Sequence, residues 1–288
     1  MEIPGSKWTL LITLALIWGS SFILMHLSLA HLSPFQLASL RIVSAGLFLL
    51  CVGFRQIPKI PHHKWKYIAI TSLFGTFIPA FLFSIAQQHL SSMVSAILNS
   101  LTPLNTLIIG ILTFGLAFKR SQFLGILVGF AGSALLIVNG AMTHGQHDYR
   151  YAFLLVIASL CYAINLNLIK KHLSDVNPLA ISVGNFTVMF LPALVILFSS
   201  GFFNQVHEAT IQTASLYVIV LGILGTGVAN IIFFRLIQTS SPVFASSVTY
   251  LIPVVAFFWG SMLGESLTPV QFLGAGIILC GVYLSGRK

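Results

Sequence analysis

Acidic residues are scarce in this chain of 288 residues. It has five Asp and Glu residues against 14 Lys and Arg, and charged residues make up 7% of the sequence, whereas a soluble domain has about 25%. None of the five lies deep within an apolar stretch. Proton coupling through a carboxylate at the middle of a membrane, which is common in pumps, therefore has no obvious carrier. Glu265 is the one candidate.

Cysteine is rare as well, and the sequence motifs of enzymes are missing. The three cysteines stand singly in apolar stretches without CxxC spacing, which indicates neither disulfide nor metal chemistry. There is no GxxxxGK, and "HEATI" at 207–211 lacks the second histidine of HExxH. We read "HGQHD" at 144–148 as a solvated linker. We therefore expect no enzyme, no catalytic residue, no cofactor and no bound metal.

Long apolar runs are what the chain has in abundance. Hydrophobic residues make up 57% of it and the mean hydropathy is +0.98. A helix that crosses the roughly 30 Å of bilayer hydrocarbon needs about 20 mostly apolar residues. Runs of this length predict an all-α integral membrane protein with ten spans, near 8–28, 34–54, 66–86, 93–117, 121–140, 150–170, 178–199, 214–237, 242–263 and 268–285.

The basic residues predict the orientation of these spans. The formal net charge of +9 could suggest nucleic acid as a partner, but Lys and Arg lie in the short loops between spans. Nearly all of them lie on one side, and Arg150 falls on the other. Because the cytoplasmic side of a membrane protein holds the Lys/Arg excess, we expect both termini in the cytoplasm and no nucleic-acid partner. The first apolar run is long enough to span, so we do not interpret it as a signal peptide.

The chain contains an internal repeat. A shift of 150 residues places residues 72–110 on 222–260 with eight identities, which are Gly75/Gly225, Thr76/Thr226, Phe83/Phe233, Gln88/Gln238, Ser91/Ser241, Leu101/Leu251, Pro103/Pro253 and Gly110/Gly260. Each half holds five spans, and because five is odd, the second half enters the membrane from the opposite side. We expect two inverted repeats, 1–140 and 150–288, joined by a linker at 141–149. Inverted repeats are typical of secondary transporters, whose substrate site lies between the halves.

Several short motifs resemble the EamA-type family of the drug/metabolite transporter superfamily. They are "LIWGSSF" (16–22), "SPFQLASLR" (33–41), "LTPL" (101–104), "YLIPV" (250–254) and "GSMLGESLTPVQFLGAGIILCGV" (260–282). The resemblance covers nearly the whole chain. The acidic residue that the family has near the end of the fourth span of a repeat is present as Glu265, but the first half has "GLAFKRSQ" (115–122) there.

This resemblance implies a function and a place for it. It implies a transporter in the bacterial inner membrane that exports amino acids or similar metabolites from the cytoplasm by alternating access. The expected partners are a small-molecule metabolite and the lipid bilayer, and a homodimer is one possible assembly. The resemblance also implies a cavity among spans one, three, four, six, eight and nine.

Polar residues at helical spacing indicate which faces are sheltered from lipid. In the fourth span Ser95, Asn99, Thr102 and Thr106 form one stripe, and other spans carry similar ones. The alternative is that the stripes only hold helices together. Amides are harder to explain by packing, because each presents several groups that need partners. The candidate cavity-lining residues are Trp18, Ser21, Thr76, Asn99, Thr102, Tyr162, Asn165, Asn230, Thr249 and Tyr250.

Arg41 lies about 10 Å into the second span at 1.5 Å per residue, counted from Pro34. We interpret it as a brace that binds backbone carbonyls or Glu265; a substrate carboxylate and lipid headgroups are the alternatives. Pro103 and Pro253 occupy equivalent repeat positions, and they are candidate hinges or passive kinks.

Two other functions remain open from the sequence. An uncoupled facilitator or channel is favoured by the shortage of buried carboxylates, and a non-transporting membrane sensor or scaffold would have similar spans. A cavity of amides, hydroxyls and aromatic rings without fixed acids favours a neutral or zwitterionic ligand over a multivalent cation.

Overall fold

The computed structural model of the protein describes residues 6–90, 95, 98–115, 117, 119–141, 149–262 and 269–286, and within these residues it is helical. The first half contains α1 (Lys7–Leu29), α2 (Pro34–Gly53), η1 (Phe54–Lys59), η2 (His62–Lys64), α3 (Trp65–Ser72), η3 (Leu73–Phe77), α4 (Ile78–His89), α6 (Thr102–Phe114) and α7 (Arg120–Ala141). The second half contains η4 (Tyr149–Tyr151), α8 (Ala152–His172), α9 (Pro178–Ser199), α10 (Phe202–Gln205), α11 (Ala209–Val220), η5 (Leu221–Val228), α12 (Ala229–Thr239), α13 (Pro242–Ser246), α14 (Val248–Met262) and α15 (Pro269–Gly286).

Six stretches of the described chain are helical, long and apolar enough to cross a membrane. They are Lys7–Leu29, Pro34–Lys59, His62–His89, Ala152–His172, Pro178–Ser199 and Ala209–Thr239. The protein is therefore an integral membrane protein. The other four expected spans coincide with α6, α7, α13 with α14, and α15, so the count of ten stays a prediction. The expected linker lies mostly outside the described residues.

Prolines and caps set where several helices begin. Ser33 caps α2 in a capping box with Gln36, and Pro34 follows at the first helical position. Asn177 caps α9 in a similar way by accepting the N–H of Leu179, and a proline follows it too. A proline fits the first turn because the N–H it lacks would have no helical partner there. The second and seventh spans thus begin alike.

The third and eighth spans each contain a π-helical segment. These are η3, between α3 and α4, and η5, between α11 and α12. A shift of 150 residues places Leu73–Phe77 inside Leu221–Val228. Short π-helical segments within α-helices are frequently found at functional sites, so the pair marks this level of the bundle as a candidate site.

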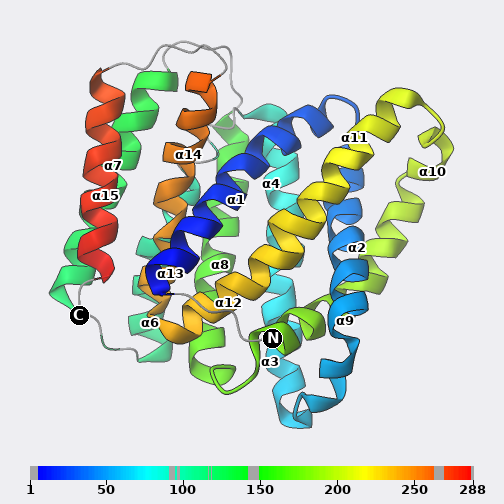
Figure 1. The fold of residues 1–288 in the computed structure, drawn as a ribbon, viewed down its shortest axis with the longest axis horizontal. Coiled ribbons are helices and arrows are strands. Elements are labelled where there is room, and N and C mark those ends of the chain that lie inside the picture. The colour runs from blue at the N-terminus through cyan, green and yellow to red at the C-terminus, as the bar shows by residue number, and fades with distance from the viewer. Residues whose placement is uncertain are drawn as a thin grey trace.

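Figure 1 shows α7 and α15 side by side at one edge of the bundle, while α2 and α9 pair at the other. Glycines allow α7 and α15 to touch, since a Cβ at Gly281 would lie 2.6 Å from Gly129 Cα. α1 begins and α15 ends at one end of the molecule, where the rings of Trp8 and Tyr283 stack at 6.4 Å. We call this the Lys64 end, and the opposite one the Arg150 end.

Two large apolar clusters and a small one, formed by Leu107, Ile126 and Val243, fill the interior of the described chain. One large cluster includes Leu10, Ile68, Ile169 and Ile237 and lies toward the Lys64 end. The other large cluster includes Met25, Phe83, Ala158 and Leu221 and lies toward the Arg150 end. Large apolar side chains also cover the outside of the helices, among them Ile12, Leu16, Leu112, Leu191 and Val195. This apolar outer surface is suited to contact with the hydrocarbon tails of lipids.

Candidate functional site

A cavity of about 110 Å³ lies between the two halves of the chain. Its walls come from α1, α2, the η3–α4 and η5–α12 spans, the fourth span with α6, α8 and the α13–α14 span. Its polar side chains are Ser21, Arg41, Thr76, Asn99, Thr102, Tyr162, Asn165, Thr226, Asn230, Ser246 and Thr249, and its aromatic walls include Trp18, Phe22, Phe83 and Phe233. The space is large enough for several waters or a small metabolite.

The structure brings nine of the ten predicted cavity-lining residues to this one cavity. They are Trp18, Ser21, Thr76, Asn99, Thr102, Tyr162, Asn165, Asn230 and Thr249. Tyr250 lies elsewhere. One residue further along the helix than Thr249, it points to α7, where its hydroxyl donates to the Ile126 carbonyl at 3.1 Å. Its ring fits only because Gly129 has no side chain, since a Cβ there would lie 2.8 Å from the ring.

Residues repeated in the two halves gather at the cavity. Gly75 and Gly225, Thr76 and Thr226, and Phe83 and Phe233 all line it. These identities are visible in the sequence, yet Thr76 was the only one of them predicted to line the site, so Thr226 and both phenylalanines were missed. The signal was available, because a symmetric site between repeats needs matching residues from each.

The π-helical segments place two side chains in the cavity. Trp18 Nε1 donates to the Gly225 carbonyl, within η5, at 2.9 Å. The side chain of Asn165 lies against Gly75, within η3, where a Cβ would come within 2.6 Å of the amide. A Cβ at Gly225 would likewise lie 2.7 Å from Ser21 Oγ, so the two glycines allow Asn165 and Ser21 of the opposite halves to approach the π-helical backbone closely.

Two amides at the cavity have unused hydrogen-bonding groups. Asn165 is 2% exposed and Asn230 is 8% exposed, yet Asn165 Oδ1 and Asn230 Nδ2 have no hydrogen-bond partner among the described residues. An unsatisfied buried polar group costs about 1–3 kcal/mol. Buried polar groups in native proteins usually have a hydrogen-bond partner. Here Asn165 Oδ1 is an acceptor and Asn230 Nδ2 is a donor, and both residues line the cavity.

Arg41 also reaches the cavity. Its Nε donates to Thr226 Oγ1 at 2.6 Å and its Nη1 lies 3.7 Å from Met25 Sδ. A Cβ at Gly222 would lie 2.7 Å from the Arg41 carbonyl oxygen, so α2 and η5 touch through their backbones here. The partner of Arg41 is thus a hydroxyl of the second half and not a backbone carbonyl, which was the expected acceptor. Glu265, its other predicted partner, lies outside the described residues.

The two candidate hinge prolines differ in local structure. Pro103 lies in the first turn of α6, which begins at Thr102 after a break. Pro253 lies inside α14, and the break in that span comes earlier, at Ser247 between α13 and α14. The fourth span of each half is thus interrupted, but the two prolines lie at different distances from the interruption.

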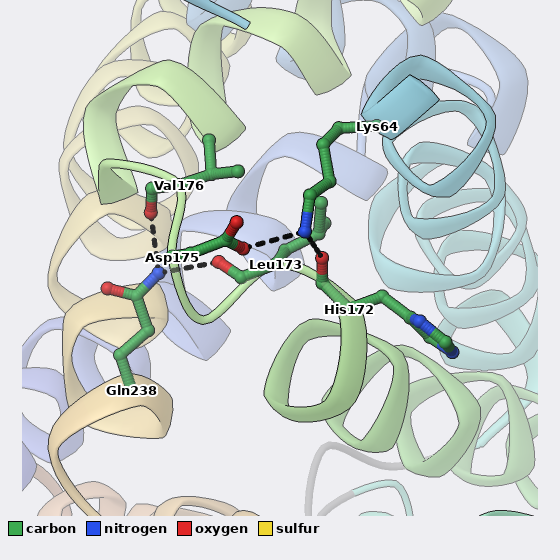
Figure 2. Close-up of polar contacts among 6 residues, drawn as sticks. All are labelled: Lys64, His172, Leu173, Asp175, Val176 and Gln238. Carbon is green, nitrogen blue, oxygen red and sulfur yellow. Dashed lines mark hydrogen bonds and ion pairs between the residues drawn. The ribbon is translucent and has the colours of Figure 1, made fainter. Parts of the chain in front are cut away.

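Polar contacts at the Lys64 end join loops and helix ends that are far apart in sequence. Lys64 Nζ donates to the His172 carbonyl at 2.7 Å and forms an ion pair with Asp175 at 2.8 Å (Figure 2). Hydrogen bonding from Lys64 is the main reason why the pKa of Asp175 lies below its usual range. The Gln238 amide donates to the carbonyls of Leu173, at 3.0 Å, and Val176, at 2.7 Å.

Comparison with known proteins agrees with this architecture. Residues 6–138 and again 150–287 match the EamA-like transporter family. The chain belongs to this family. The two matches are separate, and each covers one half of the chain.

Full-length relatives of this EamA-like protein carry transporter names. It is 26% identical over 282 residues to the "Uncharacterized inner membrane transporter YedA" of Escherichia coli, covering 95% of this chain and 88% of the relative. It is 25% identical over 284 residues to a "Probable amino-acid metabolite efflux pump" of Salmonella typhimurium, covering 96% and 93%. A solved crystal structure shares the fold, with a TM-score of 0.73 at 16% identity over 96% of this chain and 95% of the other.

Proposed function

We propose that this membrane transporter is a secondary carrier that exports small polar or amphipathic metabolites such as amino acids. The observation that carries the proposal is the cavity between the halves, whose lining pairs Gly75, Thr76 and Phe83 with Gly225, Thr226 and Phe233. A site built from matching parts of both repeats can be exposed to either side in turn as the repeats move against each other.

Several observations support two inverted five-helix repeats, 1–140 and 150–288, as the moving parts. The family matches each half separately. The π-helical segments η3 and η5 lie at equivalent positions in the two halves. The fourth span of each repeat is interrupted, just before Thr102 in the first half and at Ser247 in the second. We propose the segments from these breaks to Pro103 and Pro253 as the hinges.

The lining of the cavity suggests the substrate class. Amides, hydroxyls and aromatic rings make up its polar and flat surfaces, and no acidic side chain is among its described lining residues. A multivalent cation would find no negative charge to bind, whereas a neutral or zwitterionic molecule would find donors, acceptors and apolar walls. One relative's name, an amino-acid metabolite efflux pump, points to the same class.

The basic residues support an orientation of the protein in the membrane. Lys7, Arg55, Lys64, Lys66 and Lys171 belong to the Lys64 end, which the positive-inside rule assigns to the cytoplasm. Both termini would then be cytoplasmic. One relative is named an inner membrane transporter, which agrees with the bacterial inner membrane as the location.

Cells that produce the protein provide the test of this function. We expect them to hold less of the exported metabolite inside and more in the medium than cells that produce the Asn99→Leu variant at the same membrane level. Untargeted mass spectrometry of both pools measures this even while the substrate is unidentified. Identical pools in the two strains would contradict an export function.

An uncoupled facilitator is the second candidate, because no described acidic residue lines the cavity to carry a proton. An imposed pH gradient across proteoliposomes distinguishes the two. Uptake that follows the gradient shows proton coupling, and uptake that ignores it shows facilitated movement.

A further inference from the structure

The guanidinium of Arg41 has spare hydrogen-bonding capacity where it meets the cavity. Thr226 accepts the hydrogen bond from Nε, and among the described residues the side chain has one other polar contact, the weak one to Met25. Within the described chain, the single ion pair is that of Lys64 with Asp175. A charged group this far into a membrane needs an oppositely charged or strongly accepting partner.

We propose that Arg41 binds the carboxylate of the transported molecule. With Nε fixed by Thr226, the two Nη groups form the end of the guanidinium fork, and this fork matches a carboxylate in a bidentate pair. The proposal rests on the proposed function and assigns it a substrate class, namely small molecules with a free carboxylate.

The unpartnered amides provide the second half of this site. Tyr162 and Asn165 lie one turn apart on α8, and Thr226 and Asn230 lie about one turn apart along η5 and α12. Asn230 therefore lies one turn nearer the Lys64 end than Thr226, the partner of Arg41, and Asn165 lies one turn nearer that end than Tyr162. Asn165 Oδ1 is free to accept from an amino group, and Asn230 Nδ2 is free to donate to an oxygen. An α-amino acid carries both groups.

Thermal unfolding of the purified protein in detergent tests this assignment. The probes are the twenty L-amino acids and their primary amides, since each amide keeps the side chain and amino group but lacks the negative charge. We expect at least one acid to raise the melting temperature while its amide does not. Arg41→Gln should bind that acid about tenfold more weakly or worse and Arg41→Lys should keep part of the affinity, while the exposed Arg55→Gln serves as the matched control.

Three results would overturn the assignment: no acid stabilises the protein, an amide stabilises it as well as its acid does, or Arg41→Gln binds unchanged. Glu265→Gln should leave the preference for acids intact. Loss of that preference in Glu265→Gln would favour an Arg41–Glu265 ion pair instead. Export of an uncharged metabolite by intact cells would sustain the proposed function while contradicting this site.

A separate observation concerns the two ends of the cavity. The structure shows how the first two spans of one half align with the first two spans of the other. Pro34 begins α2 and Pro178 begins α9, so these spans align at an offset of 144 residues. This offset pairs Trp18 with Tyr162 and Ser21 with Asn165, and all four residues line the cavity. The later spans follow the offset of 150, and α4 and α12 end 150 residues apart, at His89 and Thr239.

At the Lys64 end, α12 is tied to α8 and to the loop that follows α8. Gln238 donates to the carbonyls of Leu173 and Val176, as Figure 2 shows. Lys170 donates to three carbonyls at the end of α12, the shortest bond being 2.6 Å to Ser240. Next to these contacts Ile169 and Ile237 are 0% exposed and belong to one apolar cluster, so apolar packing adds to the contact of α8 with α12 at this end.

The equivalent residues at the Arg150 end are not engaged. At the offset of 150, the residue equivalent to Gln238 is Gln88. At the offset of 144, the residue equivalent to Lys170 is His26. Both Gln88 and His26 are exposed, and neither side chain forms a hydrogen bond with the part of the chain that the structure describes. At the offset of 144, the residues equivalent to Leu173 and Val176, whose carbonyls accept from Gln238, are Leu29 and Leu32.

We infer that Gln238 and Gln88 are alternating latches, one for each state of the transporter. In the state seen here, Gln238 and Lys170 close the Lys64 end. In the opposite state, the Gln88 amide donates to the carbonyls of Leu29 and Leu32 and closes the Arg150 end, while Gln238 is released. Exchange of equivalent contacts is what inverted repeats permit, because each repeat can adopt the conformation of the other.

Spin-label distances at matched sites test the latches. One label pair, at Ser174 and Thr239, reports on the Lys64 end; its repeat equivalent, at Ala30 and His89, reports on the Arg150 end. Both are placed in the full chain after its three cysteines are replaced. We expect Gln238→Leu to lengthen the 174–239 distance and shorten the 30–89 distance. Gln88→Leu should remove any population with a short 30–89 distance, and the exposed Gln212→Leu should change neither pair.

Unchanged distances in folded Gln238→Leu would overturn the inference. So would a Gln238→Leu variant in which both ends lengthen together, because that result shows general loosening instead of exchange. Each variant is first shown to be folded by a single symmetric elution peak and a melting temperature near that of the parent.

Discussion

Trp18 of the first half donates its indole N–H to the Gly225 carbonyl of the second half at 2.9 Å, and the acceptor lies in a π-helical segment. The ring also meets Phe233 edge to face, with centroids 4.9 Å apart. One side chain thus joins the two repeats and forms a wall of the cavity. The packing of the halves and the shape of the site are set by the same contact.

The first prediction concerns this contact. Trp18→Phe removes the hydrogen bond and retains an aromatic ring against Phe233. We expect about 1 kcal/mol loss of stability, measured as a lower melting temperature, together with a lower transport rate. An unchanged melting temperature and rate would show that the bond to Gly225 contributes to neither.

Asn99 tests whether the polar stripe of the fourth span serves transport or packing. Asn99→Leu should abolish transport while folding and membrane insertion stay intact, because an apolar side chain fills part of the cavity and removes an amide from its wall. Radiolabelled or mass-detected substrate flux measures the effect, and the exposed Asn204→Leu is the control. Normal flux in Asn99→Leu would assign the residue to helix packing.

The contact of α7 with α15 depends on glycine, and α15 provides its own control. A Cβ at Gly281 would meet the backbone of Gly129, whereas one at Gly276 would meet nothing within 4 Å. Gly281→Ala should destabilise the protein by about 1–3 kcal/mol. Gly276→Ala should leave stability unchanged or raise it by up to about 1 kcal/mol. Equal melting temperatures in the two variants would contradict the close packing.

The ion pair of Lys64 with Asp175 predicts a pH dependence. Because the folded-state pKa of Asp175 is depressed by hydrogen bonding from Lys64, its contribution is present above the unfolded pKa of about 3.9 and is lost as the pH falls through the folded value. The carboxylate is 64% exposed, so the pair is worth about 0.2–1 kcal/mol. Asp175→Asn should therefore be slightly less stable than the parent at pH 7, and the difference should vanish in strong acid. A constant difference across pH would show that the charge plays no part.

Much of the fold could be predicted from the sequence because lipid imposes a length on apolar helices. The expected spans 34–54 and 178–199 match α2 and α9 within a residue, since Pro34 and Pro178 mark their starts. Within the spans, kinks or hinges were expected at Pro103 and Pro253, and the π-helical segments were not predicted. The π-helical segments have no distinctive composition, and the break at Ser247 depends on how neighbouring helices pack.

The site was predicted in part for a similar reason. Helical spacing identifies a polar face, so Asn99, Asn165 and Asn230 could be assigned to the interior. Helical spacing does not say which of two adjacent residues faces the cavity and which faces a neighbouring helix, and Tyr250 was misplaced in this way. Gly129, 121 residues away, provides the space for its ring.

Counterflow in proteoliposomes is the measurement that tests the central claim most directly. Vesicles that contain the purified protein are loaded with an unlabelled amino acid and diluted into a trace of the labelled form. A carrier that exposes one cavity to alternate sides accumulates the label transiently above equilibrium, and we predict this overshoot for the wild type and its absence for Asn99→Leu. Entry of label to equilibrium without overshoot would identify a channel, and no entry of any tested amino acid would contradict the account.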